Sequence, residues 1–434
     1  MNELSNKFQD WMEKTLLPVG SKISSQRHLA AVRDGMTVLI PLTIVGGFAC
    51  LLAVPPVPAG VTEPTNAVYA FLLAWQAWAN SIKTYLMIPY QLTMGCLTLY
   101  VVASIAYNLS GFYHMNGLNN LISAILVFLV VSDGVDLTTG TINIAMLGAG
   151  YMFGGMVVSI LVVEINHFFI KHNITIKMPD TVPPNVAAPF NVLIPLIFNV
   201  VLFSIINGAV TSLTGAGFTS LVFTIFQPLI KATGSLPSVL LICFVAQLFW
   251  FFGIHGQNMT NVVVAPITTA ALAANMEAYT AGLPLPYIYA GNAATLFGGW
   301  LAFFAMQLLM LTVCKSKQLT SLVKVSFVPS CFNINEPGVF GIPTVLNVYL
   351  FIACVLCQWI NYGVYYICAS IGLVGRFFVT LPFTTPGPVA AFLATMDWKA
   401  VVLWFILLVA DYFVIMPFIK AHDKQLCMEE AKGE

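Results

Sequence analysis

A glutamate stands in an apolar part of this chain, in the stretch SFVPSCFNINEPGVFGIP, residues 326–343. Glu336 follows Asn333 and Asn335, and helix breakers begin at Pro337. An ionised carboxylate beside two amides can hydrogen-bond several sugar hydroxyls, and it can accept a proton from one of them. A tight turn would use asparagine and glycine but would not need glutamate. We therefore interpret Glu336 as a functional residue.

A second polar group lies in LFWFFGIHGQNMTN, residues 248–261. His255 stands between two glycines, Trp250 precedes it, and Asn258 is one of four polar residues that follow it. Aromatic faces suit the C–H side of a sugar ring, and amides suit its hydroxyls. A lone histidine in a membrane is often a helix-packing residue, but these neighbours favour a binding site.

Other polar residues give weaker signals. Thr295, and Thr384 directly after Phe383, either line a cavity or belong to local helix caps. Asp411 lies in the apolar run VVLWFILLVADYFVIMPF, where a packing role and a functional role stay equally open. No Walker motif and no metal-ligand spacing is present, so we expect no cofactor and no bound metal.

The composition restricts where these residues can act. The chain has 434 residues, of which 59% are hydrophobic and 8% charged, with a formal net charge of zero. Soluble domains carry roughly a quarter charged residues, so the low charge argues against a soluble enzyme. The net charge of zero does not indicate a basic surface for binding nucleic acid. We predict an all-α integral membrane protein in the lipid bilayer.

The apolar runs predict about ten transmembrane helices, because one span takes about 20 residues. Nine candidates are 33–54, 88–109, 118–132, 142–169, 190–210, 238–254, 294–314, 348–372 and 398–419. Residues 68–82 and 218–233 are shorter and are either a further span or interfacial helices. Three apolar segments are interrupted by Pro, Gly and Asn, which favours re-entrant hairpins that line a transport site. These segments are 250–296, 326–347 and 376–397.

Clusters of basic residues indicate the cytoplasmic side of the membrane. They occur near the start of the chain, around Lys171 and Lys177, around Lys317, and near the end of the chain. This pattern predicts a multi-pass protein with both termini in the cytoplasm. The first 28 residues carry hydrophobic side chains at helical spacing and predict an amphipathic surface helix.

The stretches WFFGIHG and NINEPGVFGIP resemble the two signatures of the lactose/cellobiose/diacetylchitobiose-type enzyme IIC of the bacterial phosphoenolpyruvate-dependent sugar phosphotransferase system. LLPVGSKISSQRHLAAVRDGMTVLIPLTIVGG and IKMPDTVPPNVAAPFNVLIP resemble two other parts of such proteins, so the resemblance covers most of the chain. It implies ten spanning helices, two re-entrant hairpins and a homodimer in the bacterial inner membrane. It also implies a partner, the phosphocysteine-carrying enzyme IIB, on the cytoplasmic face.

The resemblance divides the chain into parts and assigns roles to residues. It implies an amphipathic segment 1–28, a dimerising membrane half 29–185, a sugar-binding half 186–424 and a cytoplasmic tail 425–434. By motif match, Glu336 and His255 lie at the 6-hydroxyl that receives the phosphoryl group. Asn335 and Trp250 line the sugar site, and Phe383 stands where chitobiose-type relatives have Trp.

We therefore expect a permease that transports a β-linked disaccharide, of the cellobiose or diacetylchitobiose type, while a separate IIB protein phosphorylates it. It would act as a transport-coupled transferase. The alternative is a proton- or sodium-coupled sugar symporter in which Glu336 or Asp411 takes up the proton.

Overall fold

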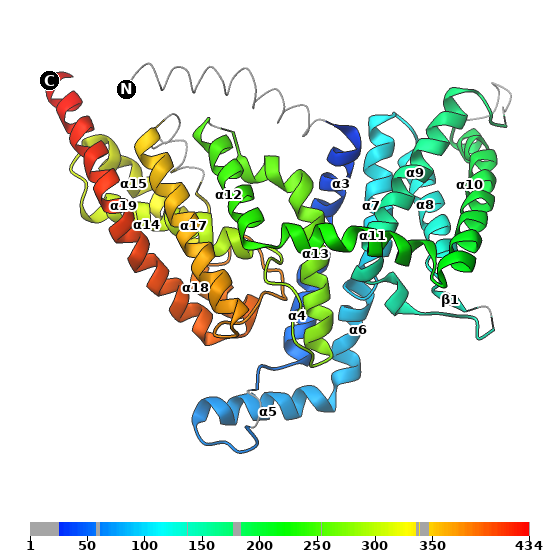
Figure 1. Ribbon diagram of the computed structural model, residues 1–434, viewed down its shortest axis with the longest axis horizontal. Coiled ribbons are helices and arrows are strands. Elements are labelled where there is room, and N and C mark those ends of the chain that lie inside the picture. The colour runs from blue at the N-terminus through cyan, green and yellow to red at the C-terminus, as the bar shows by residue number, and fades with distance from the viewer. Residues whose placement is uncertain are drawn as a thin grey trace. The chain divides into compact units, whose positions relative to one another are not determined.

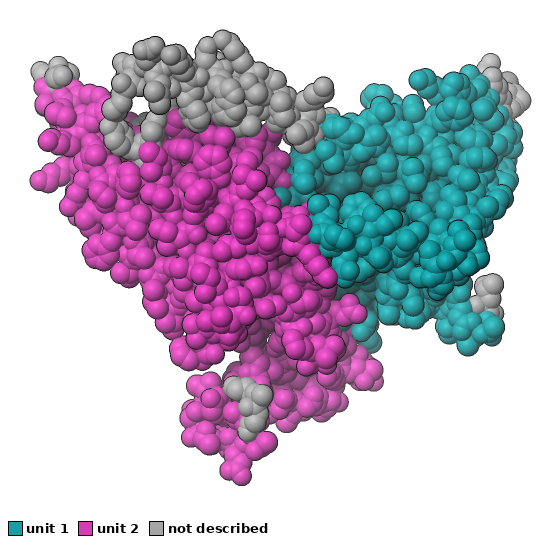
Figure 2. Space-filling view, viewed as in Figure 1, with its two compact units in different colours: residues 1–46, 88–229, 261–266 teal, residues 47–87, 230–260, 267–434 magenta. Residues whose placement is uncertain are grey.

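The computed structural model describes residues 26–57, 61–136, 138–176, 184–252, 254–335, 338 and 347–433. The chain forms two compact units, drawn in teal and magenta in Figure 2. Unit 1 comprises Met1–Gly46, Ile88–Leu229 and Asn261–Pro266, and unit 2 comprises Gly47–Met87, Ile230–Thr260 and Ile267–Glu434. Most of the predicted amphipathic segment 1–28 lies outside the described residues.

The described chain is almost entirely helical, as the composition predicts (Figure 1). Its earlier elements are α3 (Arg27–Val38), α4 (Ile40–Ala53), α5 (Ala67–Ser81), α6 (Lys83–Thr93), α7 (Leu97–Phe112), α8 (Gly117–Val131), β1 (Val135–Asp136), β2 (Thr141–Ile142), η2 (Ile144–Leu147), η3 (Ala149–Tyr151), α9 (Met152–Lys171), α10 (Pro184–Thr214) and α11 (Phe218–Thr233). The two strands form a short antiparallel hairpin in which Val135 pairs with Ile142.

The later elements contain or flank the described site residues. They are α12 (Leu236–Phe251), α13 (Gly256–Thr280), the π-helix η4 (Thr295–Trp300), α14 (Leu301–Thr312), α15 (Lys317–Cys331), α17 (Val348–Ser370), α18 (Gly387–Thr395) and α19 (Trp398–Gly433).

The membrane character predicted from composition is confirmed in the described part of the chain. Seven helices there are long and apolar enough to cross a bilayer, and the number rises to nine if each of two bent helix pairs counts as one span. The seven are Lys83–Phe112, Ala149–Lys171, Phe190–Thr214, Gly256–Thr280, Thr295–Thr312, Leu350–Ser370 and Trp398–Ala431. The total of ten spans stays a prediction.

In unit 1, helices α7, α8 and α9 pack against one another around an apolar core that includes Phe128 and Phe203. Buried amides also connect the helices. The Asn166 side chain donates to Asn120 at 2.8 Å, and Asn199 donates to Asn166 at 2.9 Å. These bonds join α8, α9 and α10, and hydrogen bonds between helices of this kind contribute to helix association in a membrane.

In unit 2, the long helix α19 packs along α14 and α17 (Figure 1, red). Met306, Leu350 and Ile415 belong to the apolar core of these helices. The described part of the predicted tail 425–434 continues α19 up to Gly433, and its place in the cytoplasm stays a prediction. There Glu430 accepts the Ser316 hydroxyl at 2.7 Å, which anchors the start of α15.

Two of the segments predicted as re-entrant differ from each other. Residues 256–280 form one helix of 25 residues. The prediction that the chain is broken throughout 250–296 is therefore wrong for this part. Pro266 lies inside this helix. A membrane helix tolerates proline, because neighbouring helices can satisfy the backbone carbonyl that proline leaves without a hydrogen bond. The segment 376–397 does fold back on itself: the Phe378 N–H donates to the Ala394 carbonyl at 3.0 Å, and α18 spans only nine residues.

Candidate functional site

The glutamate-containing motif is described only in part. Glu336 and Pro337 lie outside the described residues, whereas Asn333, Asn335 and Gly338 are described. Asn335 is half-buried, and its side-chain oxygen is buried without a hydrogen-bond partner among the described residues. An unpartnered acceptor directly before Glu336 suits a ligand that donates hydroxyl hydrogens.

Asn333 joins the two interrupted segments of unit 2. Its backbone has a φ of 59°, in the left-handed region that asparagine tolerates better than most residues. Its amide nitrogen donates to the carbonyls of Phe383 at 3.1 Å and Thr385 at 2.5 Å. The fold thus brings Asn333, Phe383 and Thr384 together, and it uses the Asn333 nitrogen to hold the loop that carries the other two.

Gln307 on α14 is a residue of this region that the motifs do not include. It is fully buried and accepts the Ser326 hydroxyl at 2.8 Å, while its amide nitrogen has no partner among the described residues. A Cβ at Gly338 would collide with that nitrogen. Glycine therefore lets the chain approach a buried amide donor two residues after Glu336. A glutamine inside the apolar run LAFFAMQLLMLT was the available sequence signal.

The histidine motif forms the junction between α12 and α13. The Trp250 indole N–H donates to the Gln257 side-chain oxygen, and the Trp250 and His255 ring centroids are 4.4 Å apart. A Cβ at Gly256 would collide with the Ala246 carbonyl oxygen, so the start of α13 can approach α12 only with glycine there. Trp250 and His255, predicted to share one site, do lie together.

His255 is the N-cap of α13. Its Nδ1 accepts the Asn258 backbone N–H at 3.2 Å, while the Asn258 side chain is exposed. When the ring is neutral, its proton is therefore on Nε2. The structure gives His255 a capping role in addition to the binding role expected from the sequence.

These two roles predict different effects for two substitutions. His255→Ala should weaken sugar binding and phosphoryl transfer, and loss of the cap should lower the stability by about 1 kcal/mol. His255→Asn should keep the cap, because asparagine is a good N-cap residue, but lose the ring. We expect both variants to bind sugar poorly and only the alanine variant to melt earlier. Binding titrations and melting curves in detergent test this, and normal sugar binding by both variants would remove His255 from the site.

The two motifs rest on one apolar core in unit 2. Trp250 packs against the cluster that includes Phe303 and Met306, and Phe303 is also among the nearest neighbours of Gly338. Thr295 begins the π-helix η4 and is half-buried. The interaction of Thr295 or Thr384 with a sugar stays a prediction.

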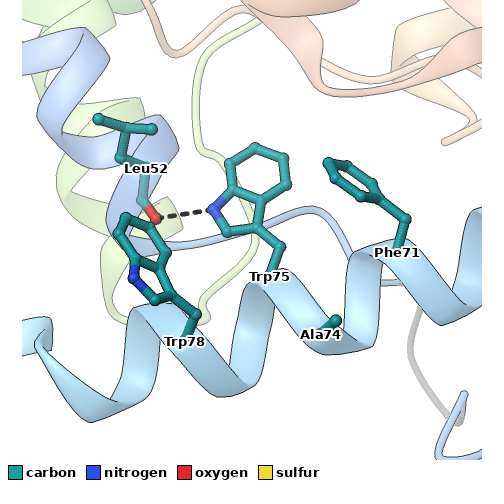
Figure 3. Close-up of a pocket in the computed structure, with 5 residues that line it drawn as sticks. All are labelled: Leu52, Phe71, Ala74, Trp75 and Trp78. Carbon is teal, nitrogen blue, oxygen red and sulfur yellow. Dashed lines mark hydrogen bonds between the residues drawn. The ribbon is translucent and has the colours of Figure 1, made fainter.

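A cavity of about 450 Å³ lies between α4 and α5 and is lined by Leu52, Phe71, Ala74, Trp75 and Trp78 (Figure 3). The Trp75 N–H donates to the Leu52 carbonyl at 3.1 Å, so this polar group is already occupied. The apolar lining contains none of the predicted site residues. Within the described chain, no group of three or more His, Cys, Asp or Glu side chains could hold a metal ion.

Comparison with known proteins gives consistent matches. Residues 33–357 match the family model described as phosphotransferase system, EIIC. The oligo-beta-mannoside-specific EIIC component of Bacillus subtilis strain 168 is 32% identical over 422 residues, covering 94% of this chain and 92% of that protein. The lichenan permease IIC component of the same organism is 30% identical over 444 residues, covering 98% and 96%.

A solved structure is also similar. It is the crystal structure of the transporter ChbC, the IIC component from the N,N'-diacetylchitobiose-specific phosphotransferase system. Its TM-score is 0.88 with 29% identity, over 98% of this chain and 100% of that one.

Proposed function

Since this chain belongs to the EIIC family of the phosphotransferase system, we propose that it carries a β-linked disaccharide across the bacterial cytoplasmic membrane for phosphorylation by a separate phospho-IIB protein. The family membership makes the chain a multi-pass membrane sugar permease of the lactose/cellobiose type, whose transport is coupled to phosphotransfer. We further propose a homodimer built by residues 29–185 and a sugar site within residues 186–424.

One observation carries the site proposal. At the α12–α13 junction, the Trp250 ring lies against His255 and its N–H is bound to Gln257. This hydrogen bond holds the indole in place. The junction therefore combines an aromatic face, an imidazole and amide groups within an apolar environment. This is the mixture of groups that suits an uncharged sugar, whose rings have apolar C–H faces and polar hydroxyl edges.

The proposed reaction takes place at the 6-hydroxyl of the sugar. The oxygen attacks the phosphorus of the phosphocysteine of IIB, so that the S–P bond breaks and a P–O6 bond forms. The Glu336 carboxylate accepts the hydroxyl proton, and the cysteine of IIB leaves as a thiolate. His255 lies near the hydroxyl and helps to orient it. The product is charged and cannot return across the apolar membrane.

The relatives support a β-linked substrate. Their names refer to oligo-beta-mannosides, lactose, lichenan and diacetylchitobiose, whose sugars share β-linkages. We propose cellobiose or diacetylchitobiose as the substrate type. Phe383, which we place where chitobiose-type relatives have Trp, is exposed and lies on the loop held by Asn333.

The proposal is tested with purified protein in detergent. Cellobiose, diacetylchitobiose, β-mannobiose and lactose are titrated, with the α-linked maltose as the control. The bound sugars are then incubated with phosphorylated IIB. We expect binding of at least one β-linked disaccharide and formation of its 6-phosphate. Binding of maltose alone, or of a β-disaccharide without phosphorylation, would contradict the proposal.

The orientation in the membrane gives a separate prediction. Lys317 begins α15 and is exposed, and a cysteine placed there, in a background without the nine native cysteines, should react with impermeant reagents only from the cytoplasm. Thr139, in the hairpin before α9, is the matched position and should react only from outside. Labelling of position 317 in intact cells would show that the orientation is the opposite of the predicted one. Lys177, the other predicted marker, lies outside the described residues.

A further inference from the structure

Three glutamine side chains surround Gly299 in the π-helix η4. Gln247 comes from α12, Gln257 from the first turn of α13, and Gln358 from α17. Their amide nitrogens lie 3.6–3.7 Å from the position that a Cβ of Gly299 would occupy. We call Gln247, Gln257 and Gln358 the glutamine triad. Polar side chains at membrane depth are costly and usually functional, so their convergence from three helices requires an explanation.

Two members of the triad have defined surroundings. The Gln257 oxygen accepts the Trp250 N–H, so its amide nitrogen is the atom that faces Gly299. Gln358 is 3% exposed, and its side-chain oxygen has no hydrogen-bond partner among the described residues. A buried polar atom without a partner is unfavourable, and a polar ligand in the same space would relieve it.

The two glycines of η4 meet the triad differently. A Cβ at Gly298 would lie 2.8 Å from the Gln358 Cγ, so Gly298 is needed for packing. A Cβ at Gly299 would make only ordinary van der Waals contacts with the amides. Packing therefore does not demand glycine at position 299, and its small size leaves room beside three amide groups. π-Helical turns of this kind often occur at functional sites.

We infer that the glutamine triad is a subsite that binds hydroxyl groups of the disaccharide and contributes to the choice of sugar. This inference rests on the proposed function. Primary amides both donate and accept, as hydroxyls do, and they carry no charge, so they suit a neutral sugar better than an ion. The Trp250–Gln257 hydrogen bond connects this subsite to the ring that we place in the sugar site.

Gly299→Ala tests the inference with little disturbance of the fold. The added methyl group occupies the space beside the three amides, so we expect at least a tenfold loss of disaccharide affinity at an unchanged melting temperature. Gly363→Ala is the matched control, because a Cβ at Gly363 on α17 meets no atom within 4 Å. It should leave the affinity unchanged, and because alanine is the better helix former it should keep or slightly raise the melting temperature.

Gln247→Leu provides a second test that does not depend on the glycine. It should change the ratio of the affinities for cellobiose and lactose, two disaccharides that differ at one hydroxyl, by about tenfold. A purely structural role would leave this ratio unchanged. If Gly299→Ala and Gln247→Leu both bind like the unmodified protein, the inference is overturned while the proposed function stands. If the unmodified protein binds no disaccharide, the proposed function fails, and the inference with it.

Discussion

Replacing Glu336 by glutamine is expected to reduce phosphoryl transfer from IIB by roughly 10²–10⁴-fold, the effect typical of losing a general base. A sugar hydroxyl is a poor nucleophile as long as it keeps its proton. Glutamine has the size of glutamate and can still hydrogen-bond the hydroxyl, but it cannot accept the proton. Sugar binding should therefore persist in this variant, although weakened. Transfer rates at saturating sugar, measured beside equilibrium binding, separate the two effects.

Two further variants make this result specific. Glu336→Ala should lose both binding and transfer, because it removes the hydrogen bond as well as the base. Glu277→Gln, an exposed glutamate on α13, is the matched control and should leave both unchanged. If the Glu336→Gln variant transfers phosphate at the unmodified rate, Glu336 is not the base and has only a hydrogen-bonding or structural role.

Replacing Asn361 by leucine is expected to destabilise the protein by about 3 kcal/mol. The Asn361 amide on α17 donates to the Asp411 carboxylate on α19 at 2.7 Å, and both residues are buried. Leucine has a similar volume but no donor, so the carboxyl group would lose this partner inside the membrane. Replacing Asn361 and Asp411 together by leucine should recover most of the loss, because no polar group remains unpaired. Melting temperatures in detergent test this, and an unchanged value for the single variant would contradict the packing role.

A substitution of Asp411 alone distinguishes a packing role from a role in proton uptake. Asp411→Asn can still accept from Asn361 but cannot carry a proton on and off. We expect this variant to transfer phosphate to sugar at the unmodified rate. Loss of transport in a correctly folded Asp411→Asn protein would favour the symporter instead.

The sequence predicts the apolar helices well where hydrophobic length alone decides. The predicted spans 294–314 and 348–372 match Thr295–Thr312 and Leu350–Ser370 closely. The prediction fails at 256–280, where Gly256 and Pro266 suggest a broken segment but the chain forms one continuous helix. Gly256 instead allows α13 to begin close to α12, and this close approach depends on tertiary contacts that a single sequence does not reveal.

The site was only partly predictable for the same reason. Trp250 and His255 are near in sequence, and their pairing follows from local structure. Gln247, Gln307 and Gln358 lie far apart in sequence, each alone in an apolar run, and no spacing connects them. Applying to glutamine the criterion used for Asp411, a polar side chain within an apolar span, would have found them. Helix packing brings Gln247 and Gln358 together at Gly299, and it places Gln307 beside Gly338.

Transport into membrane vesicles that hold phosphorylated IIB tests the central claim most directly. A phosphotransferase permease should accumulate the 6-phosphate of the disaccharide inside the vesicles, at a rate that is unaffected when ionophores collapse the proton and sodium gradients. Vesicles with unphosphorylated IIB should accumulate none. Accumulation of free sugar that stops when the gradients collapse would contradict the account and establish ion-coupled symport.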